Sequence, residues 1–355
     1  MKNMLKKIAY VMHWNVFRND GVVKKIQTQM KFWHPHVEAK AFAITPGTNS
    51  TQSPILESET FFYQSFTDRF GAAKKLVAAV ADWSPDAIYF RYNPPYHPLQ
   101  MLFQRTPTVV ELNTDDVEEY RLGPPHRYWY NRLTRGQVYR AAAGLISVCH
   151  EYKDLAHTQK YQKPSLVIAN AVELSDFPQL PAPDNMRPRL VFMGAEDTPW
   201  HGLDKIVWLA QQLVEFDFDI IGMDQNALKD APANLRAHGY LNREAYIDIL
   251  AQANIALGTL ALHRKRGNEA SPLKVREYLA VGLPVINAYR DTDFMEGADF
   301  ILEIPNTENN VQTHLEQIRQ FVHEKKYCRV ARESIAHIDA VHKEQQRLNF
   351  ISQFV

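Results

Sequence analysis

The chain has 355 residues, of which 45% are hydrophobic and 23% charged, and its forty basic residues balance its forty acidic ones. This length favours two domains, and the composition is that of a globular protein, which excludes extended disorder. The zero net charge argues against nucleic acid as a partner. Cys149 and Cys328 lie too far apart for a metal-binding motif, so we expect free thiols.

In the first half, short apolar runs alternate with helical stretches, which predicts a parallel sheet covered on both faces. The first run follows a basic start and is too short for a membrane span or a cleaved leader, so we expect a cytoplasmic protein. The predicted strands are residues 6–14, 86–92, 107–113, 142–149 and 164–170.

Residues 175–188 contain four prolines and show no periodicity, which predicts an interdomain linker. We therefore expect an N-terminal domain over residues 1–175 and a C-terminal domain over 188–339. The carboxyl ends of two such sheets are where ligands bind. Strands are predicted again at residues 189–194, 218–223, 253–260 and 283–289, before a wholly helical end from about residue 311.

The most informative segment is EASPLKVRE, residues 269–277. Ser271 is a good N-cap and Pro272 suits a first helical position, which predicts that a helix begins here. Its unpaired N–H groups around Leu273 and Lys274 would form an anion site, strengthened by the helix dipole and by the lysine charge. A diphosphate is the natural ligand of such a site.

Two glutamates in this segment differ in position. Glu269 precedes the helix and can project toward a bound sugar. Glu277 lies within the helix on the same face as Lys274 and can reach the paired hydroxyls of a ribose. The alternative interpretation is an ordinary amphipathic helix with surface charges.

The Glu-x7-Glu spacing and the following EYLAVGLPVI resemble GT-B glycosyltransferases of the family 4 type, which retain anomeric configuration. The resemblance implies an α/β fold of two Rossmann-like, doubly wound domains facing across a cleft, with the C-terminal helix 340–355 completing the first domain. It also implies a nucleotide-sugar donor, with no cofactor and no metal. Further matching segments, in the family's order, are NDGVVKKI, AAAGLISVCHEYKDL, SLVIANAVELSDF, RLVFMGAEDTPWHGLDKI and HGYLNREAYIDILAQANIAL.

The resemblance also implies residue roles. Glu269 matches the glutamate that contacts the donor sugar, and Glu277 matches the one that binds the ribose. Gly21 falls in the loop whose backbone approaches the donor phosphate, where a Cβ atom would interfere. Tyr240 and Leu241 lie in the turn that borders the nucleobase.

The chain differs from the family at residues that usually bind the donor phosphate. Members usually carry an arginine where Ala195 and Glu196 stand, and a lysine where His201 stands. The donor diphosphate would then rely on Lys274, the helix N-terminus and His201.

The acceptor side is expected in the N-terminal domain. Asn113 stands where many members place a histidine at the end of a strand, and it is our second catalytic candidate. His13 and Arg91 also end predicted strands, and a guanidinium suits a phosphate or an acidic acceptor, although a structural ion pair explains Arg91 equally well. Asp116 is a further acceptor-side candidate, with a turn or helix-cap role as its alternative.

Asp115–Asp116 and Asp291–Asp293 resemble metal-binding carboxylate pairs, but loops are rich in aspartate for turn reasons alone, and we expect no metal. Residues 1–45 hold eight basic and two acidic side chains together with Trp14, Phe32 and Trp33. This pattern suggests peripheral contact with an anionic membrane, with a charged helix face as the alternative.

The sequence therefore predicts transfer of a sugar, with retention, from a nucleoside diphosphate sugar to a glycan or lipid-linked acceptor in bacterial surface polysaccharide assembly. Two alternatives remain open. One is a nucleotide-sugar 2-epimerase of the same fold, and the other is a non-catalytic GT-B partner protein, suggested by the missing phosphate-binding cations.

Overall fold

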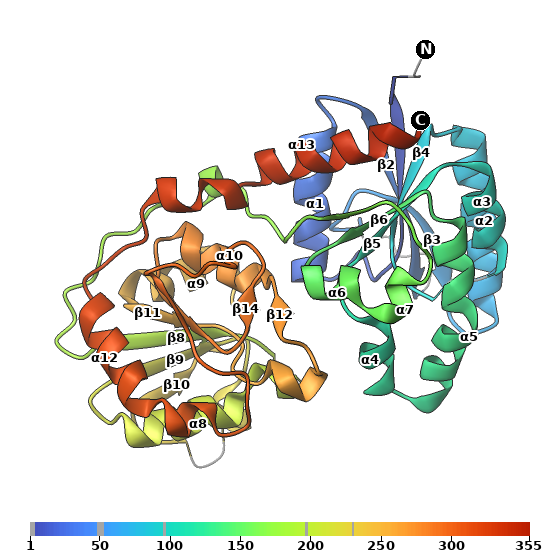
Figure 1. Ribbon diagram of the computed structural model, residues 1–355. Helices are drawn as coiled ribbons and strands as arrows, with labels where there is room; N and C mark the ends of the chain where they lie inside the picture. The colour runs from blue at the N-terminus through green and yellow to red at the C-terminus, as the bar shows by residue number, and fades with distance from the viewer. Residues whose placement is uncertain (1–3, 48–52, 95–96, 196–197, 229–230) are drawn as a thin grey trace. The chain divides into compact units, whose positions relative to one another are not determined.

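A computed structural model describes residues 4–47, 53–94, 97–195, 198–228 and 231–355. The chain divides into two compact units, one formed by Met1–Ala169 with Ala340–Val355 and the other by Asn170–Asp339 (Figure 1). Each unit is a parallel sheet flanked by helices, and the expected α/β class is confirmed. The facing of the two sheets across a cleft stays a prediction.

The first unit contains a seven-stranded sheet in the order β3-β2-β1-β4-β5-β6-β7, with every described pair parallel. The predicted strands of this half all occur, somewhat shortened, and β2 and β3 are additional. The strands are β1 (Lys7–His13), β2 (Glu38–Pro46), β3 (Glu59–Tyr63), β4 (Ala87–Arg91), β5 (Thr108–Leu112), β6 (Gly144–Ser147) and β7 (Ser165–Val167).

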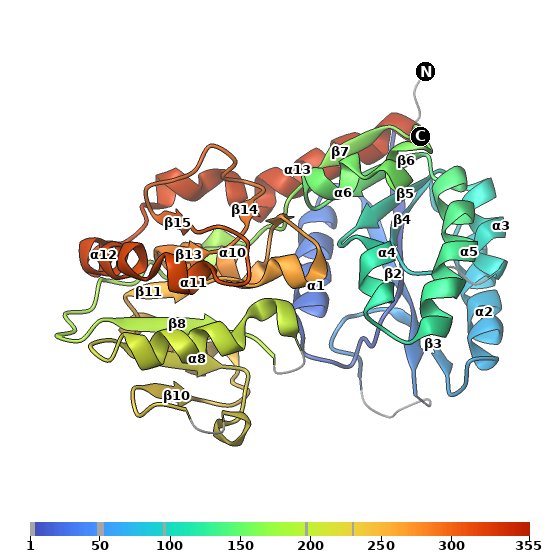
Figure 2. The same cartoon turned by 60° about the horizontal axis from the view of Figure 1, so that its bottom comes forward.

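Alternate residues of β1 enter different cores, because successive side chains of a strand point to opposite faces. Ile8 and Tyr10 pack with α1 and α13, whereas Ala9 and Val11 pack with α2, α3 and α5. Figure 2 shows these two helical layers on either side of the sheet. The helices are α1 (Gly21–Trp33), α2 (Asp68–Trp83), α3 (His97–Arg105), α4 (Asp116–Arg121), α5 (Pro125–Ala141), α6 (His150–Asp154), α7 (Ala156–Gln159) and α13 (Ala340–Ile351).

The C-terminal helix α13 packs on the first unit. Leu348 and Ile351 are buried in the same core as Trp33 of α1. Glu344 accepts a hydrogen bond from the Trp33 indole at 2.9 Å, and Arg347 donates to the Tyr89 hydroxyl at 2.6 Å. This helix therefore supplies both apolar and polar parts of the first unit's interior.

The second unit contains a six-stranded parallel sheet in the order β10-β9-β8-β11-β13-β15, and a small parallel pair, β12 with β14. The four strands expected in this half occur as β8, β9, β11 and β13. The strands are β8 (Arg189–Met193), β9 (Asp217–Ile221), β10 (Leu235–Ala237), β11 (Ile255–Leu257), β12 (Glu269–Ala270), β13 (Val285–Asn287), β14 (Arg290–Asp291) and β15 (Ile301–Glu303).

Two helical layers cover this second sheet as well. Phe192 of β8 packs with α8 and α12, and its neighbour Val191 packs with α9 and α10. The helices and 3-10 turns are η1 (Leu174–Asp176), η2 (Pro199–His201), α8 (Leu203–Gln212), η3 (Gln225–Ala227), α9 (Arg243–Gln252), η4 (Leu262–Lys265), α10 (Leu273–Ala280), α11 (Asn310–Thr313), α12 (Leu315–Lys325) and η5 (Arg332–Ile338).

The segment expected to link the domains belongs to the second unit. Val172, Leu174 and Phe177 are buried in a core with Tyr246 and Leu279. The proline-rich stretch thus begins as part of a folded layer, because apolar side chains placed between its prolines have a core to enter. The structure separates the units at Ala169, where the sequence analysis expected residues 175–188.

Both sheets contain a point where the strand order reverses. In the first sheet β2 lies on one side of β1 and β4 on the other, and in the second sheet β9 and β11 flank β8 in the same way. Connections leave such a point in opposite directions, so the carboxyl ends of the central strands open a crevice in which α/β proteins bind ligands. Ligand-binding sites are therefore expected at the carboxyl ends of β1 and β4 in the first sheet and of β8 and β11 in the second.

Candidate functional site

Close backbone packing marks the end of β8. A Cβ atom on Gly194 would lie 2.5 Å from the Phe192 ring, and one on Gly222, where φ is +93°, would lie 2.4 Å from the Gly194 carbonyl oxygen. Only glycine fits at Gly222, where the contact is with backbone, whereas a side chain at Gly194 would have to displace the Phe192 and His201 rings. The two chain segments after β8 and β9 therefore touch.

Lys274 projects into this region from the first turn of α10. Its side-chain nitrogen is buried, lies 3.9 Å from the centre of the Phe192 ring and has no hydrogen-bond partner among the described residues. Burial lowers the pKa of this lysine well below its ordinary value. A buried cation without a partner is costly, so this ammonium is a strong candidate for an anionic ligand.

His201 also packs against Phe192, with the two ring centres 5.5 Å apart. Burial, and then the charge of Lys274, lower the pKa of His201 to about 2. Its Nδ1 atom is also buried without a hydrogen-bond partner within the described part of the chain. The structure thus brings together the two side chains that were predicted to replace the missing phosphate-binding cations. The alanine of that pair, Ala195, is exposed, and Glu196 lies outside the described residues.

Lys265 is a third basic group here that the sequence analysis missed. Its nitrogen lies 5.0 Å from the centre of the Trp200 ring, and its charge also lowers the pKa of His201. The sequence feature that could have indicated this group is the basic run His263–Arg266, which ends shortly before Glu269. Backbone hydrogen bonds from Leu260 and Ala261 to η2 join the segment after β11 to His201.

The helix start differs from the prediction. Pro272 occupies the cap position with φ −69° and ψ 136°, α10 begins at Leu273, and no side chain caps it. The Ser271 hydroxyl instead accepts hydrogen bonds from the Asn170 backbone and from the Arg276 guanidinium, at 2.9 and 2.8 Å. The N–H groups of the first turn are therefore not taken by the serine, which suits an external anion better than the predicted cap does.

Arg276 explains the Asp291–Asp293 pair. This fully buried guanidinium donates to both oxygens of Asp291 at 2.7 and 2.8 Å and lies 3.0 Å from Asp293. These carboxylates and hydrogen bonds hold the pKa of Arg276 above its ordinary value. Because Arg276 also holds Ser271, it positions the turn between Glu269 and α10, a role that the sequence analysis missed.

The two motif glutamates occupy different surroundings. Glu269 begins β12, is 6% exposed and pairs in register with Arg290 of β14. Glu277 is half-buried on α10, and its Oε2 atom accepts a hydrogen bond of 2.8 Å from the Tyr246 hydroxyl of α9. Glu277 is thus oriented by a neighbour, as a ligand-binding carboxylate needs to be.

The expected nucleobase turn lies between β10 and α9. Tyr240 is 74% exposed, and Leu241 packs partly against the core that contains Tyr246. Asn242 caps α9 by accepting a hydrogen bond from the Ala245 backbone at 3.0 Å. An exposed aromatic ring on a capped, anchored turn is available for stacking.

In the first unit, Gly21 is the first residue of α1 and is exposed. The Asp20 carboxylate caps this helix by accepting from the Val22 and Val23 backbones at 3.1 and 3.0 Å. Two N–H groups that a phosphate would use are therefore already bonded. The role of Gly21 stays a prediction, limited to its own N–H and its lack of a side chain.

Asn113 belongs to a buried ion cluster around Glu111. Its oxygen accepts from Lys25 at 2.7 Å and its nitrogen donates to Glu111 at 3.0 Å. Glu111 is fully buried and also pairs with Lys25 at 2.9 Å, and with Arg91 and Arg347 at 3.4 Å each. Arg91 therefore makes the structural ion pair that was its alternative interpretation, and the catalytic role of Asn113 remains untested.

Asp116 does not face an acceptor. It is 2% exposed, and its carboxylate accepts from Arg135 at 2.8 Å through both oxygens and from Asn131 at 2.7 Å. Asp116, the first residue of α4, is thus a core ion-pair partner, and the predicted acceptor role is wrong because α5 carries the complementary Arg135.

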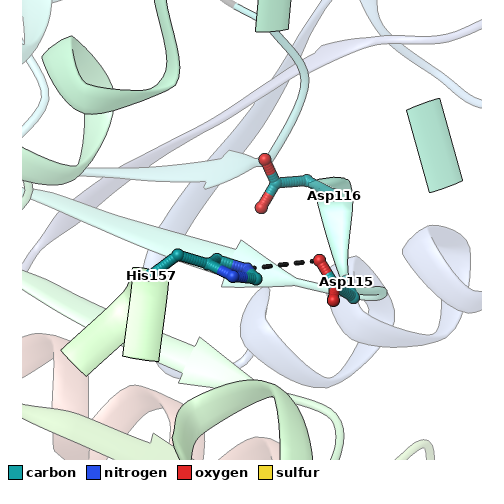
Figure 3. A group of neighbouring side chains, drawn as sticks. All are labelled: Asp115, Asp116 and His157. Carbon is teal, nitrogen blue, oxygen red and sulfur yellow. Dashed lines mark ion pairs between the residues drawn. The ribbon is translucent and has the colours of Figure 1, made fainter. Parts of the chain in front are cut away.

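Asp115, Asp116 and His157 lie close enough together to suggest a metal site (Figure 3). Asp115 caps α4 and pairs with His157 at 3.2 Å, and Asp116 is fully engaged by Arg135. A cation would have to displace the bidentate arginine. The trio is therefore explained by the packing of α4 and α5.

His13 ends β1 and lines a cavity of about 580 Å³ at the strand-order reversal of the first sheet. Its Nε2 atom lies 2.9 Å from the Tyr63 hydroxyl. Burial, and then the charges of Arg69 and Arg127, lower its pKa to about 4. His13 is therefore neutral near pH 7 and can accept or donate one hydrogen bond.

The basic and aromatic side chains of residues 1–45 do not gather on one face, as the suggested membrane contact would need. Trp33 is fully buried and Lys25 is bound to Glu111 in the core. Lys7 and Lys40 pair with Glu38 and Glu59 on neighbouring strands. These side chains point to different faces of the sheet and of α1, and that cannot be predicted from their positions in the sequence.

Residues 205–353 match a family model described as "Glycosyl transferase-like". No curated protein sequence matches the chain. None of the described helices has the length and apolar character of a membrane-spanning segment.

Solved glycosyltransferase structures share the fold over almost the whole chain. Anabaena HepE in complex with UDP and glucose has a TM-score of 0.69 at 15% identity, covering 98% of this chain and 100% of that one. The lipopolysaccharide outer core galactosyltransferase WaaB has a TM-score of 0.69 at 12% identity, with coverage of 98% and 100%. A glycosyltransferase from Rickettsia africae has a TM-score of 0.69 at 11% identity, with coverage of 99% and 98%. The GT-B fold and the resemblance to glycosyltransferases are confirmed, and the narrower resemblance to family 4 stays a prediction.

Proposed function

We propose that the protein transfers a sugar from a nucleoside diphosphate sugar to a glycan or lipid-linked acceptor, with retention and without a metal. The observation that carries this proposal is the buried Lys274 ammonium at the start of α10, beside the carboxyl end of β8, which has no hydrogen-bond partner among the described residues. A glycosyl transfer of this kind needs a stabilised diphosphate leaving group, and a fixed cation beside free helix N–H groups supplies it.

The donor would be held along α10 and the turns beside it. Lys274, the N–H groups near Leu273, and His201 would bind the diphosphate. Glu277, held by Tyr246 at 2.8 Å, would accept hydrogen bonds from the ribose hydroxyls. Tyr240 and Leu241 would border the nucleobase.

Glu269 would contact the donor sugar. It precedes α10 and is held on the short β12–β14 pair, which Arg276 and Asp291 tie down. Contacts with the sugar ring can strengthen as positive charge develops at the anomeric carbon, whereas ribose contacts change little. Only interactions that improve in the transition state raise the catalytic rate.

A UDP-sugar is the first donor to test, because the Anabaena HepE structures of this fold contain UDP, glucose and UDP-glucose. WaaB, which shares the fold, is a lipopolysaccharide outer core galactosyltransferase, and this supports surface polysaccharide assembly as the setting.

We place the protein in the cytoplasm with peripheral contact to the inner face of an anionic membrane. Helix α5 supports this contact better than the N-terminal stretch does, since it carries three exposed arginines, Arg127, Arg132 and Arg140, and no acidic residue. Trp129 and Leu133, one turn apart on α5, are 61% and 76% exposed. Aromatic and aliphatic side chains beside arginines suit the interface of an anionic bilayer. Sedimentation with phosphatidylglycerol vesicles tests this, and Trp129→Ala with Leu133→Ala should reduce the bound fraction.

Incubation with labelled UDP-sugars, with and without acceptor extracts, distinguishes the proposal from its rivals. A transferase releases UDP and labels the acceptor, and Glu269→Gln should lower this turnover on the order of 100-fold. An epimerase would convert the sugar without an acceptor. A non-catalytic partner would bind or ignore the nucleotide and change nothing, and this outcome would overturn the proposal if it held across all nucleoside diphosphate sugars.

A further inference from the structure

We propose that the cavity in the first unit binds the acidic group of the acceptor, a phosphate or a carboxylate carried on a sugar. The cavity opens at the carboxyl ends of β1 and β4, and its identification as an acceptor site rests on the proposed glycosyl transfer. Its described lining residues are His13, Tyr63, Phe66, Arg69, Asn93, Pro94, Tyr120, His126, Arg127 and Tyr130.

The lining is cationic. Its positive charge comes from Arg69 and Arg127, and none of its described members carries a carboxylate. Among the residues that the structure describes, neither arginine forms an ion pair with an acidic side chain. This sets them apart from Arg91 and Arg135, whose guanidinium groups are paired with Glu111 and Asp116.

Arg69 is held in place although no counter-ion is found among the described residues. Its guanidinium lies 4.6 Å from the centre of the Tyr63 ring and 5.7 Å from that of Phe66. Its Nε atom is buried and has no hydrogen-bond partner in the described part of the chain. A guanidinium fixed by stacking, with an unused donor, is arranged for the paired hydrogen bonds that phosphate and carboxylate oxygens accept.

The positive charges reach the interior of the cavity. The charges of Arg69 and Arg127, after burial, lower the pKa of His13. The electrostatic potential at the end of β1 is therefore positive, and an anion placed between the two arginines would relieve it.

The remaining walls suit a sugar. Hydrogen bonds link them into a fixed frame: Tyr120 donates to Asn93 at 3.1 Å, Asn93 donates to the His13 carbonyl at 3.1 Å, and the His13 ring meets Tyr63 at 2.9 Å. A volume of about 580 Å³ is within the range of small-molecule sites. Such a prearranged site loses little entropy when a ligand binds.

Calorimetric titration of the full-length protein tests the proposal, with glucose, glucose 6-phosphate, glucuronate and inorganic phosphate as separate titrants. We expect the phosphorylated or carboxylated sugar to bind at least about tenfold more tightly than glucose, as befits hydrogen bonds to a charged group. The comparison of glucose 6-phosphate with glucuronate identifies the preferred acid, and inorganic phosphate shows how much the anion contributes alone.

Arg69→Gln should weaken binding of the acidic sugar about tenfold or more. Arg127→Gln should do the same, and because Arg127 is exposed, this variant keeps the packing of the core. Arg105→Gln, which removes the same charge from an exposed position on α3 outside the cavity, is the matched control and should change nothing. Equal binding of glucose and its acidic derivatives, or no acidic titrant bound by the wild type, would overturn the proposal.

These titrations contain no nucleotide, so they separate the two claims. Binding of an acidic sugar in a protein that turns over no nucleotide sugar would leave the cavity assigned and the glycosyl transfer refuted. Turnover with a strictly neutral acceptor, unaffected by either arginine variant, would do the reverse.

Discussion

The side-chain nitrogen of Lys274 lies 3.9 Å from the centre of the Phe192 ring, in a region where it finds no hydrogen-bond acceptor among the described residues. A second buried lysine in the same unit shows the contrast. Lys205 donates to the carbonyls of Leu260 and Thr307 and to Asn310 at 3.1, 2.7 and 2.8 Å. One lysine is satisfied by the fold, and the other is arranged to meet a ligand.

Replacing Lys274 by methionine should therefore stabilise the ligand-free protein. The variant removes a buried polar group that has no hydrogen-bond partner among the described residues, so the free energy of unfolding should rise by about 1–3 kcal/mol. Urea denaturation without ligand measures this change. Lys205→Met is the matched control and should destabilise by a similar amount, because it removes three hydrogen bonds. The Leu260 carbonyl and the Asn310 side chain each keep a second donor, but the Thr307 carbonyl is left with none among the described residues. Destabilisation by both variants would mean that Lys274 has a structural partner.

The stability of both units should fall in mild acid. Burial holds the pKa of His13 at about 4 and that of His201 at about 2, whereas an unfolded histidine titrates near 6.5. The unfolded chain therefore binds more protons below pH 6.5, and the free energy of unfolding decreases as the pH falls from 6.5 toward the folded pKa values. Between pH 6.5 and 5 each histidine should contribute a loss of about 1–2 kcal/mol.

Urea denaturation at pH 7 and at pH 5 measures this loss, with His13→Gln and His201→Gln beside the wild type. Each variant should reduce the difference between the two pH values. A difference that stays unchanged in both variants would assign the acid sensitivity to other groups.

Sugar transfer should survive metal removal. The carboxylates that resemble metal ligands are already bound to arginines, Asp116 to Arg135 and Asp291 to Arg276. The diphosphate charge would be balanced by Lys274 and by helix N–H groups. Turnover is measured in excess EDTA and after addition of magnesium or manganese, and a requirement for either ion would contradict the metal-independent mechanism.

The C-terminal helix should be essential to the first unit. Ile351 is fully buried in the core shared with Trp33, so Ile351→Ala should lower the free energy of unfolding by about 2–5 kcal/mol. Gln346→Ala, at an exposed position of the same helix, should stay within about 0.5 kcal/mol. Equal stability of both variants in thermal denaturation would show that α13 contributes little.

Strand positions could be read from the sequence wherever a strand is buried and rich in β-branched or aromatic residues, as in β1 and β8. The alanine-rich β2 and the two-residue strands β12 and β14 lack that signal and were missed. Lys274 and His201 could be named because the motif and its spacing are local. The partners of Asp116 and Arg91 could not be named, because Arg135 and Glu111 are 19 and 20 residues away and meet them only after folding.

The residues that line the cavity also could not all be predicted from the sequence. His13 could be selected because it ends a strand, but Arg69 and Arg127 stand on two helices, α2 and α5, whose common approach to the end of β1 depends on the strand order. The buried position of Arg276 could not be predicted for a different reason. An arginine inside an amphipathic helix usually faces solvent, and only the buried Asp291 beside it makes a fully buried guanidinium stable.

Calorimetric titration with nucleoside diphosphates, beginning with UDP, tests the central claim most directly, because it measures the donor site without an acceptor. We expect at least one nucleoside diphosphate to bind the wild type. Lys274→Met and Glu277→Gln should each weaken it by about tenfold or more, as expected for loss of a hydrogen bond to a charged group. Glu269→Gln, which alters the proposed sugar contact and keeps the size of the side chain, should bind it as the wild type does. Equal affinity in wild type and Lys274→Met, or no binding of any nucleoside diphosphate, would contradict the account.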